Sequence, residues 1–95
     1  MILAIDVGNT NIVIGGLEGE EIRFQARYNT DRAKTEDEYA LIFMDMFRLE
    51  EISPDEIEGG IISSVVPELR KILQLAIQKL TGKCLMILNP DLDID

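Results

Sequence analysis

The sequence predicts one α/β domain over residues 1–95, built on a five-stranded mixed sheet whose strands, numbered along the chain, lie in the order 3-2-1-4-5. Short apolar runs rich in β-branched residues indicate five strands. Two stretches with apolar residues at i, i+3 and i+4 indicate helices between the later strands. The element order is strand–strand–strand–helix–strand–helix–strand. Apolar residues make up 46% of the 95-residue chain, which is typical of a globular domain.

The chain begins with a predicted β-hairpin. Residues 2–5 and 12–14 are short apolar runs and indicate its two strands. Residues 6–11 then form the tip. Gly8 and Asn9 tolerate a positive φ, which a tight hairpin turn demands, so both are expected to adopt it.

The composition of this tip indicates a phosphate-binding turn. Gly8 lets the backbone approach a ligand, and consecutive turn amides can hold an anion. Asn9, Thr10 and Asn11 add short neutral donors, while the carboxylate of Asp6 can hold Mg²⁺ beside phosphate oxygens. The alternative is a solvated turn in which Asp6 bonds only local amides. The expected phosphate-binding residues are Asp6, Val7, Gly8, Asn9, Thr10, Asn11, Ile12 and Val13, with Asp6 as the metal ligand.

The next stretch predicts the edge of the sheet. The Gly-rich residues 15–21 indicate a second turn. Apolar and polar residues then alternate over 22–27, which indicates a strand with Ile22, Phe24 and Ala26 on one buried face. The first three strands therefore form an antiparallel meander, with the third strand at the edge. Residues 29–34 form a polar loop.

Capping signals place the helices. Thr35 and Glu38 match a capping box that begins a helix, which runs to about Leu49. Its broad apolar face is expected to pack on the sheet, and contact of part of it with a partner is the alternative. Residues 53–56 repeat the capping pattern and predict a single helical turn.

The last part of the chain predicts a second strand–helix–strand unit. Residues 59–63 indicate a buried strand, and residues 64–67 open a helix that ends at Gly82 as its C-cap. Residues 84–88 indicate the fifth strand. Asn89 and Pro90 predict a turn, and residues 91–95 are too few to classify.

Polar residues follow two strands that are expected to be parallel neighbours. Asp6 ends the first strand, and Ser63 and Ser64 end the fourth. Ligands of such sheets bind at the carboxyl ends of parallel strands, so the two serines are expected at the edge of a substrate site. The alternative role for Ser63 and Ser64 is capping of the helix that follows, and both roles can hold together.

Charge and residue usage exclude several function classes. The formal net charge is −9, so neither nucleic acid nor an anionic membrane is an expected partner. The chain has no histidine and one cysteine, which excludes Ser-His-Asp and Cys-His catalysis and His or multi-Cys zinc sites within it. Cys84 is expected to be buried and inert in its apolar strand. A lone thiol fits a reducing cytoplasm, and the four apolar residues before Asp6 are too few for a signal peptide.

The strands predict an uncovered sheet face. Several runs are apolar on both sides, which is typical of sheets covered on both faces. Right-handed crossovers in the predicted strand order place both helices on one face. The other face would be bare hydrocarbon, so these 95 residues are expected to be an incomplete folding unit that associates or is poorly soluble alone.

Three segments resemble one family. They are Asp-Val-Gly-Asn-Thr-Asn at residues 6–11, Thr-Glu-Asp-Glu-Tyr at 35–39 and Ser-Ser-Val-Val-Pro at 63–67. With this element order, the chain resembles the ribonuclease H-like half-domain of the actin, Hsp70 and sugar-kinase superfamily, and within it type III pantothenate kinase. The match to that family's first phosphate motif comprises Asp6, Gly8, Asn9, Thr10 and Asn11.

The resemblance implies an activity and its requirements. Members transfer the γ-phosphoryl group of ATP to pantothenate and make 4'-phosphopantothenate, the first step toward coenzyme A. They need Mg²⁺ or another divalent ion and a monovalent cation such as K⁺ or NH₄⁺, and they act as cytoplasmic homodimers. The family chain is more than twice as long, and its catalytic carboxylate, in a Gly-x-Asp-Arg segment, would follow Asp95. The resemblance therefore implies an N-terminal part that is inactive alone and holds no catalytic residue.

Two other functions stay open at this point. The chain could be a non-catalytic regulatory or binding module that kept the fold, or half of a sugar or acetate kinase. The complete 6–11 segment favours an enzyme, because a scaffold has no need of Asp6. The acceptor pantothenate follows from the resemblance and not from spacing or composition.

Overall fold

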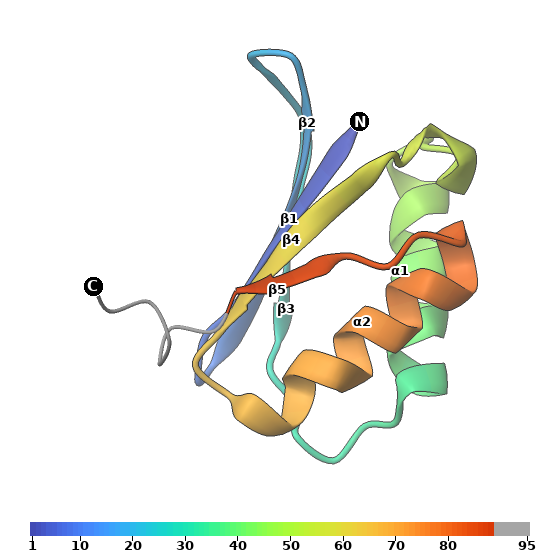
Figure 1. The fold of residues 1–95 in the computed structure, drawn as a ribbon. Helices are drawn as coiled ribbons and strands as arrows, with labels where there is room; N and C mark the ends of the chain where they lie inside the picture. Colours follow the sequence, from blue (N-terminus) through green and yellow to red (C-terminus); the bar gives the residue numbers. More distant parts are fainter. Residues whose placement is uncertain (89–95) are drawn as a thin grey trace.

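The computed structural model describes residues 1–88, and its sheet has the predicted strand order, β3-β2-β1-β4-β5. The predicted turn at Asn89 and Pro90 lies outside the described residues. Two long helices and one short 3₁₀ helix connect the later strands (Figure 1). The elements are β1 (Ile2–Val7), β2 (Asn11–Glu18), β3 (Glu21–Asn29), α1 (Glu36–Leu49), η1 (Pro54–Glu56), β4 (Gly59–Ser64), α2 (Pro67–Thr81) and β5 (Met86–Leu88).

The pairing of the strands confirms the predicted mixed sheet. β1 pairs antiparallel with β2, and β2 pairs antiparallel with β3, which lies at the edge. β1 and β4 are parallel, as are β4 and β5. Parallel neighbours need a long crossover connection, and here α1 lies in the connection that leads to β4 and α2 in the connection from β4 to β5. The carboxyl ends of β1 and β4 therefore lie together, in the register that pairs Asp6 with Ser63.

The turn between β2 and β3 differs from the prediction. β2 continues through Gly15 and Gly16, and the turn comes at Gly19, whose φ is 62°. Gly16 has a packing role, since a Cβ there would lie 2.4 Å from Cε1 of Phe24 and 2.8 Å from Sδ of Met1. The glycines that indicated a turn are therefore strand residues, and one of them makes room for a core aromatic ring.

A bulge corrects the predicted face of β3. Leu17 pairs with Ile22 and Gly16 pairs with Phe24, which leaves Arg23 as the extra residue. One extra residue moves the side chains beyond it to the opposite face. Phe24 is buried as predicted, but Ile22 is 65% exposed on the other face of the sheet.

Capping explains where the helices begin and end. Oγ1 of Thr35 accepts from the backbone N–H of Glu38, and the Glu38 carboxylate accepts from the N–H of Thr35 at 2.8 Å, so the predicted capping box is confirmed. Ser53 caps η1 in the same manner. Gly82 ends α2 in the left-handed conformation, with φ 75°, as its place after the helix predicted.

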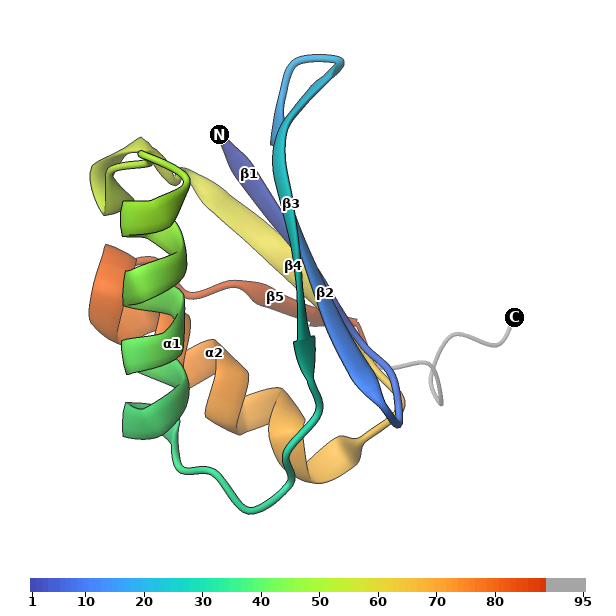
Figure 2. The ribbon, with the colours of Figure 1, turned by 180° about the vertical axis from the view of Figure 1, so that it is seen from behind.

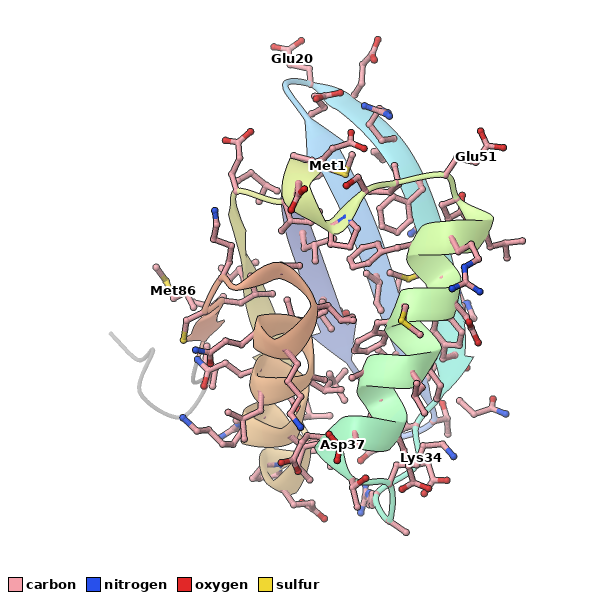
Figure 3. The ribbon with its side chains drawn as sticks, turned by 90° about the vertical axis from the view of Figure 1, so that its right-hand side faces the viewer. Met1, Glu20, Lys34, Asp37, Glu51 and Met86 are labelled. Atoms are coloured by element: carbon pink, nitrogen blue, oxygen red, sulfur yellow. The ribbon has the colours of Figure 1, made fainter. Side chains whose placement is uncertain are left out.

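Both long helices cover the same face of the sheet, as the right-handed crossovers predicted (Figures 1 and 2). Figure 3 shows them side by side in front of the strands. The core between the layers takes alternate residues of β1 and β2 together with the apolar stripes of α1 and α2. The largest fully buried side chains include Leu3, Ile5, Ile12, Ile14, Tyr39, Phe43, Phe47, Leu69 and Leu73.

Cys84 is exposed, so the prediction that it is buried is wrong. β5 begins at Met86, and the buried residue of this segment is Leu85. The backbone C=O of Leu85 accepts a 2.8 Å hydrogen bond from Nε2 of Gln74, which holds Leu85 against α2. Because neighbouring residues in extended chain point in opposite directions, burial of Leu85 turns Cys84 outward.

The second face of the sheet exposes apolar side chains in the described residues. They include Ile22, at 65%, and Met86, at 63%, from strands on either side of the sheet centre. No helix among residues 1–88 is long and apolar enough to cross a membrane.

We expect the isolated 95 residues to self-associate through this face, because apolar patches of this kind drive association. Sedimentation velocity over a concentration series should show oligomers, and Ile22→Lys with Met86→Lys should shift them toward monomer. Leu49→Lys is the matched control, since Leu49 is 79% exposed but lies on α1 on the helix side. A compact, cooperatively melting parental monomer at all concentrations would contradict the prediction.

Candidate active site

The turn between β1 and β2 is short and closed by its own backbone. Residues 8–10 connect the strands, and the N–H of Gly8 donates to the C=O of Asn11 at 2.8 Å. Neither Gly8 nor Asn9 has a positive φ, so that prediction is wrong. Gly8 instead relieves a tight contact, because a Cβ there would lie 3.3 Å from the Asn11 oxygen.

The loop after β3 holds the carbonyl groups of this turn. The N–H of Thr30 donates to the C=O of Thr10 at 2.9 Å, and its hydroxyl donates to the C=O of Gly8 at 2.8 Å. Within residues 1–88, the backbone N–H groups of Asn9 and Thr10 donate no hydrogen bond. Two adjacent free amides beside engaged carbonyls are an arrangement that can bind an anion.

Asp6 stands beside the turn with a free carboxylate. Its neighbours Ile5 and Val7 are buried under the helices, so alternation along β1 turns Asp6 to the uncovered face, where it is exposed. No hydrogen bond or ion pair within residues 1–88 engages this carboxylate, so the local-amide alternative finds no support in these residues. Ser63 lies next to it on β4 and faces the same way.

A hollow extends from Asp6 and Ser63 across the uncovered face. Its volume is about 300 Å³, and its lining is mainly apolar. The lining residues are Ala4, Ile5, Asp6, Val13, Gly15, Leu17, Ile22, Gln25, Ile61 and Ser63. A polar end beside an apolar floor is the usual composition of a small-molecule site.

The residues present fit a magnesium site in which the protein supplies one carboxylate and the remaining ligands are waters and phosphate oxygens. Within residues 1–88, no three Asp, Glu, His or Cys side chains gather around one point. Mg²⁺ in kinase sites is commonly held by one or two carboxylates, waters and the nucleotide phosphates, which needs no such cluster. Asp6 supplies one exposed carboxylate next to the free turn amides.

Several predicted site residues point away from this edge. The side chains of Val7 and Ile12 are fully buried on the helix side. Ser64 is also buried, and its hydroxyl donates to the C=O of Val66 at 2.8 Å and accepts from the N–H of Val66 at 2.9 Å. The Ser64 hydroxyl therefore stabilises the chain just before α2, and Ser63 is the serine that faces the hollow.

Sequence reasoning gave no role to Thr30 and Arg32, which contact the turn, or to the Tyr39 hydroxyl, which holds the loop between them and α1. Nη2 of Arg32 donates to Oδ1 of Asn9 at 2.8 Å. The Tyr39 hydroxyl donates to the C=O of Asp31 at 2.7 Å and accepts from its N–H at 3.0 Å. Burial raises the pKa of Tyr39, so this hydroxyl stays protonated at neutral pH. Thr30 and Arg32 lie in a loop without periodicity, and no local signal pairs that loop with the turn.

A sheet of this order, with a tight turn between its first two strands and both helices on one face, defines a half-domain of the actin-like ATPase type. The sequence model of the type III pantothenate kinase family matches residues 2–95. The chain belongs to the type III pantothenate kinase family.

Individual relatives agree with this assignment. The chain is 42% identical over 90 residues to a type III pantothenate kinase of Moorella thermoacetica, a match that covers 95% of this chain and 35% of the relative. It is 45% identical over 83 residues to one of Brevibacillus brevis, covering 87% of this chain and 31% of the relative. The chain spans about a third of the length of the curated relatives it matches.

Proposed function

We propose that this chain supplies the ATP phosphate-binding part of an enzyme that phosphorylates pantothenate to 4'-phosphopantothenate, in the first step of coenzyme A biosynthesis. The observation that carries the proposal is the exposed carboxylate of Asp6 next to the unpaired amides of Asn9 and Thr10. An anion-binding turn beside a free carboxylate suits a metal–phosphate complex better than either metal or phosphate alone.

Each residue of the site has a distinct part in this function. The amides of Asn9 and Thr10 bind phosphate oxygens, and the side chains of Thr10 and Asn11 add donors at the same edge. Asp6 orients Mg²⁺, which when bound neutralises charge on the phosphates. Ser63 lies at the substrate edge of the hollow. Phosphoryl transfer depends mainly on positioning and on such neutralisation.

The remaining requirements belong to the enzyme as a whole. We assign no general base and no monovalent-cation ligand to this chain. The K⁺ or NH₄⁺ requirement, the homodimer and the cytoplasmic location rest on the family resemblance. The relatives are named as pantothenate kinases, which favours pantothenate over a sugar or acetate as the acceptor.

The test is the acceptor preference of the purified protein that carries this chain. With Mg-ATP, we expect ADP release that depends on pantothenate, and 4'-phosphopantothenate identified by mass spectrometry. Glucose and acetate should give no phosphorylated product. Phosphorylation of glucose or acetate would favour the other kinase class, and ATP binding without turnover of any acceptor would favour the non-catalytic module.

A further inference from the structure

A positively charged side chain from another loop, that of Arg32, lies next to the turn at residues 6–11. Nη2 of Arg32 lies 2.8 Å from Oδ1 of Asn9, and the Arg32 side chain is exposed. We propose that Arg32 is a further phosphate-positioning residue, whose guanidinium exchanges Asn9 for oxygens of the nucleotide phosphate chain when ligand binds. This inference rests on the proposed function and deepens it.

The backbone around Arg32 is fixed, while its side chain is free to move. Thr30 is bonded to the carbonyls of Gly8 and Thr10, and Asp31 is held by the Tyr39 hydroxyl through both its C=O and its N–H. The carboxylate of Asp31 also accepts from the N–H of Ala33 at 2.9 Å. The hydrogen bonds therefore keep the backbone at Arg32 beside the turn before any ligand arrives, so binding does not have to order this loop.

The charge of Arg32 has no acidic partner within residues 1–88. Three other cations of the described chain do have acidic partners: Arg23 pairs with Glu18, Lys79 with Asp37, and Lys34 lies 3.6 Å from Asp31. Among the described residues, Arg32 bonds only to the neutral amide oxygen of Asn9. A guanidinium forms stronger, charge-assisted and often bidentate hydrogen bonds with phosphate, so a phosphate oxygen should displace Asn9.

The net charge of the chain makes such a cation important. The formal net charge is −9, which opposes the approach of a polyphosphate. Aimed amides carry only partial charges, whereas a guanidinium contributes a full positive charge at hydrogen-bond distance from the turn. Arg32 is therefore suited to hold the nucleotide by its phosphates and not by its base or sugar.

The competing role for Arg32 is structural support of Asn9. Three substitutions separate the two roles. Arg32→Gln keeps a neutral N–H donor on a shorter side chain and removes the charge. Arg32→Lys keeps the charge and loses the fork of donors. Arg32→Ala removes both.

The experiment measures Mg-ATP and Mg-ADP dissociation constants by calorimetry on the protein that carries this chain. We expect Arg32→Ala and Arg32→Gln to weaken Mg-ATP binding roughly ten- to hundredfold, and Arg32→Lys to recover part of the loss. The loss should be larger for Mg-ATP than for Mg-ADP and should shrink as salt rises. Arg48→Ala is the matched control, because Arg48 is exposed in the last turn of α1, at the end of the helix opposite the loop that carries Arg32.

Each outcome decides the proposal. If Arg32→Gln binds Mg-ATP like the parental protein while Arg32→Lys does not, Arg32 supports Asn9 and the inference falls. It also falls if Arg32→Ala binds Mg-ATP as tightly as Arg48→Ala, and in that case the proposed function still stands. If the parental protein binds no Mg-ATP, the proposed function and the inference fall together.

Discussion

Asp6→Asn is expected to remove most phosphoryl transfer without changing the fold. Asparagine has the same shape, and the Asp6 carboxylate is exposed with no hydrogen bond or ion pair within residues 1–88, so the substitution disturbs no packing there. An amide carries no negative charge, so it cannot attract Mg²⁺ and hold it in place as a carboxylate can. We expect kcat to fall by roughly a hundredfold or more, as when a preorganised electrostatic group is removed from a site.

The measurement is steady-state ADP release by the protein that carries this chain, over a range of Mg²⁺ concentrations, with thermal melting in parallel. Asp55→Asn is the matched control, because Asp55 is an exposed acidic residue of η1, before the amino end of β4 and away from the turn. Both variants should melt like the parental protein. If Asp6→Asn turns over ATP at the parental rate, the metal role of Asp6 is wrong.

Gly60→Ala is expected to destabilise the fold strongly. Gly60 lies in β4 next to Leu3 of β1, in the centre of the sheet. A Cβ at Gly60 would lie 2.2 Å from the backbone oxygen of Leu3 and 3.0 Å from its carbonyl carbon and its nitrogen. Backbone atoms of a paired strand cannot rotate away as a side chain can. The cost should reach or exceed the upper end of the usual ~1–3 kcal/mol for overpacking.

The adjacent residue provides the control for this prediction. A Cβ at Gly59 would meet no atom within 4 Å, so Gly59→Ala should change the unfolding free energy little or raise it slightly through the unfolded state. Urea unfolding of both variants, at a concentration where their oligomeric states agree, gives the comparison. Equal midpoints for Gly60→Ala and Gly59→Ala would show that the two strands can separate without cost.

Much of the fold follows from local rules in the sequence. Thr35 and Glu38 place the start of α1, and Gly82 places the end of α2, because capping depends on neighbouring atoms. The apolar runs of β1 and β4 and the helices between the later strands determine the strand order through the handedness of crossovers. Asp6 and Ser63 could be placed together for the same reason.

The direction in which individual side chains point is harder to predict from the sequence. The alternating pattern predicts a buried Ile22 and the apolar run predicts a buried Cys84, but a bulge at Arg23 and the burial of Leu85 turn both outward. Gly16 resembles a turn residue in the sequence. Its actual role is to leave room for the ring of Phe24, and Phe24 lies on another strand, so no local pattern indicates this role. A shift of one residue in a strand reverses every face beyond it, and a local pattern rarely records such a shift.

The sequence by itself therefore determined the class of fold, the turn at residues 6–11 and the carboxylate beside it. Only the tertiary structure decided that Thr30 holds the loop against that turn, that Tyr39 holds the loop against α1, and that Arg32 stands next to Asn9. The hydrogen bonds from Thr30 to Gly8 and from Arg32 to Asn9 join residues more than twenty positions apart. Such contacts have no periodicity along the chain, so they exist only once the strands have paired.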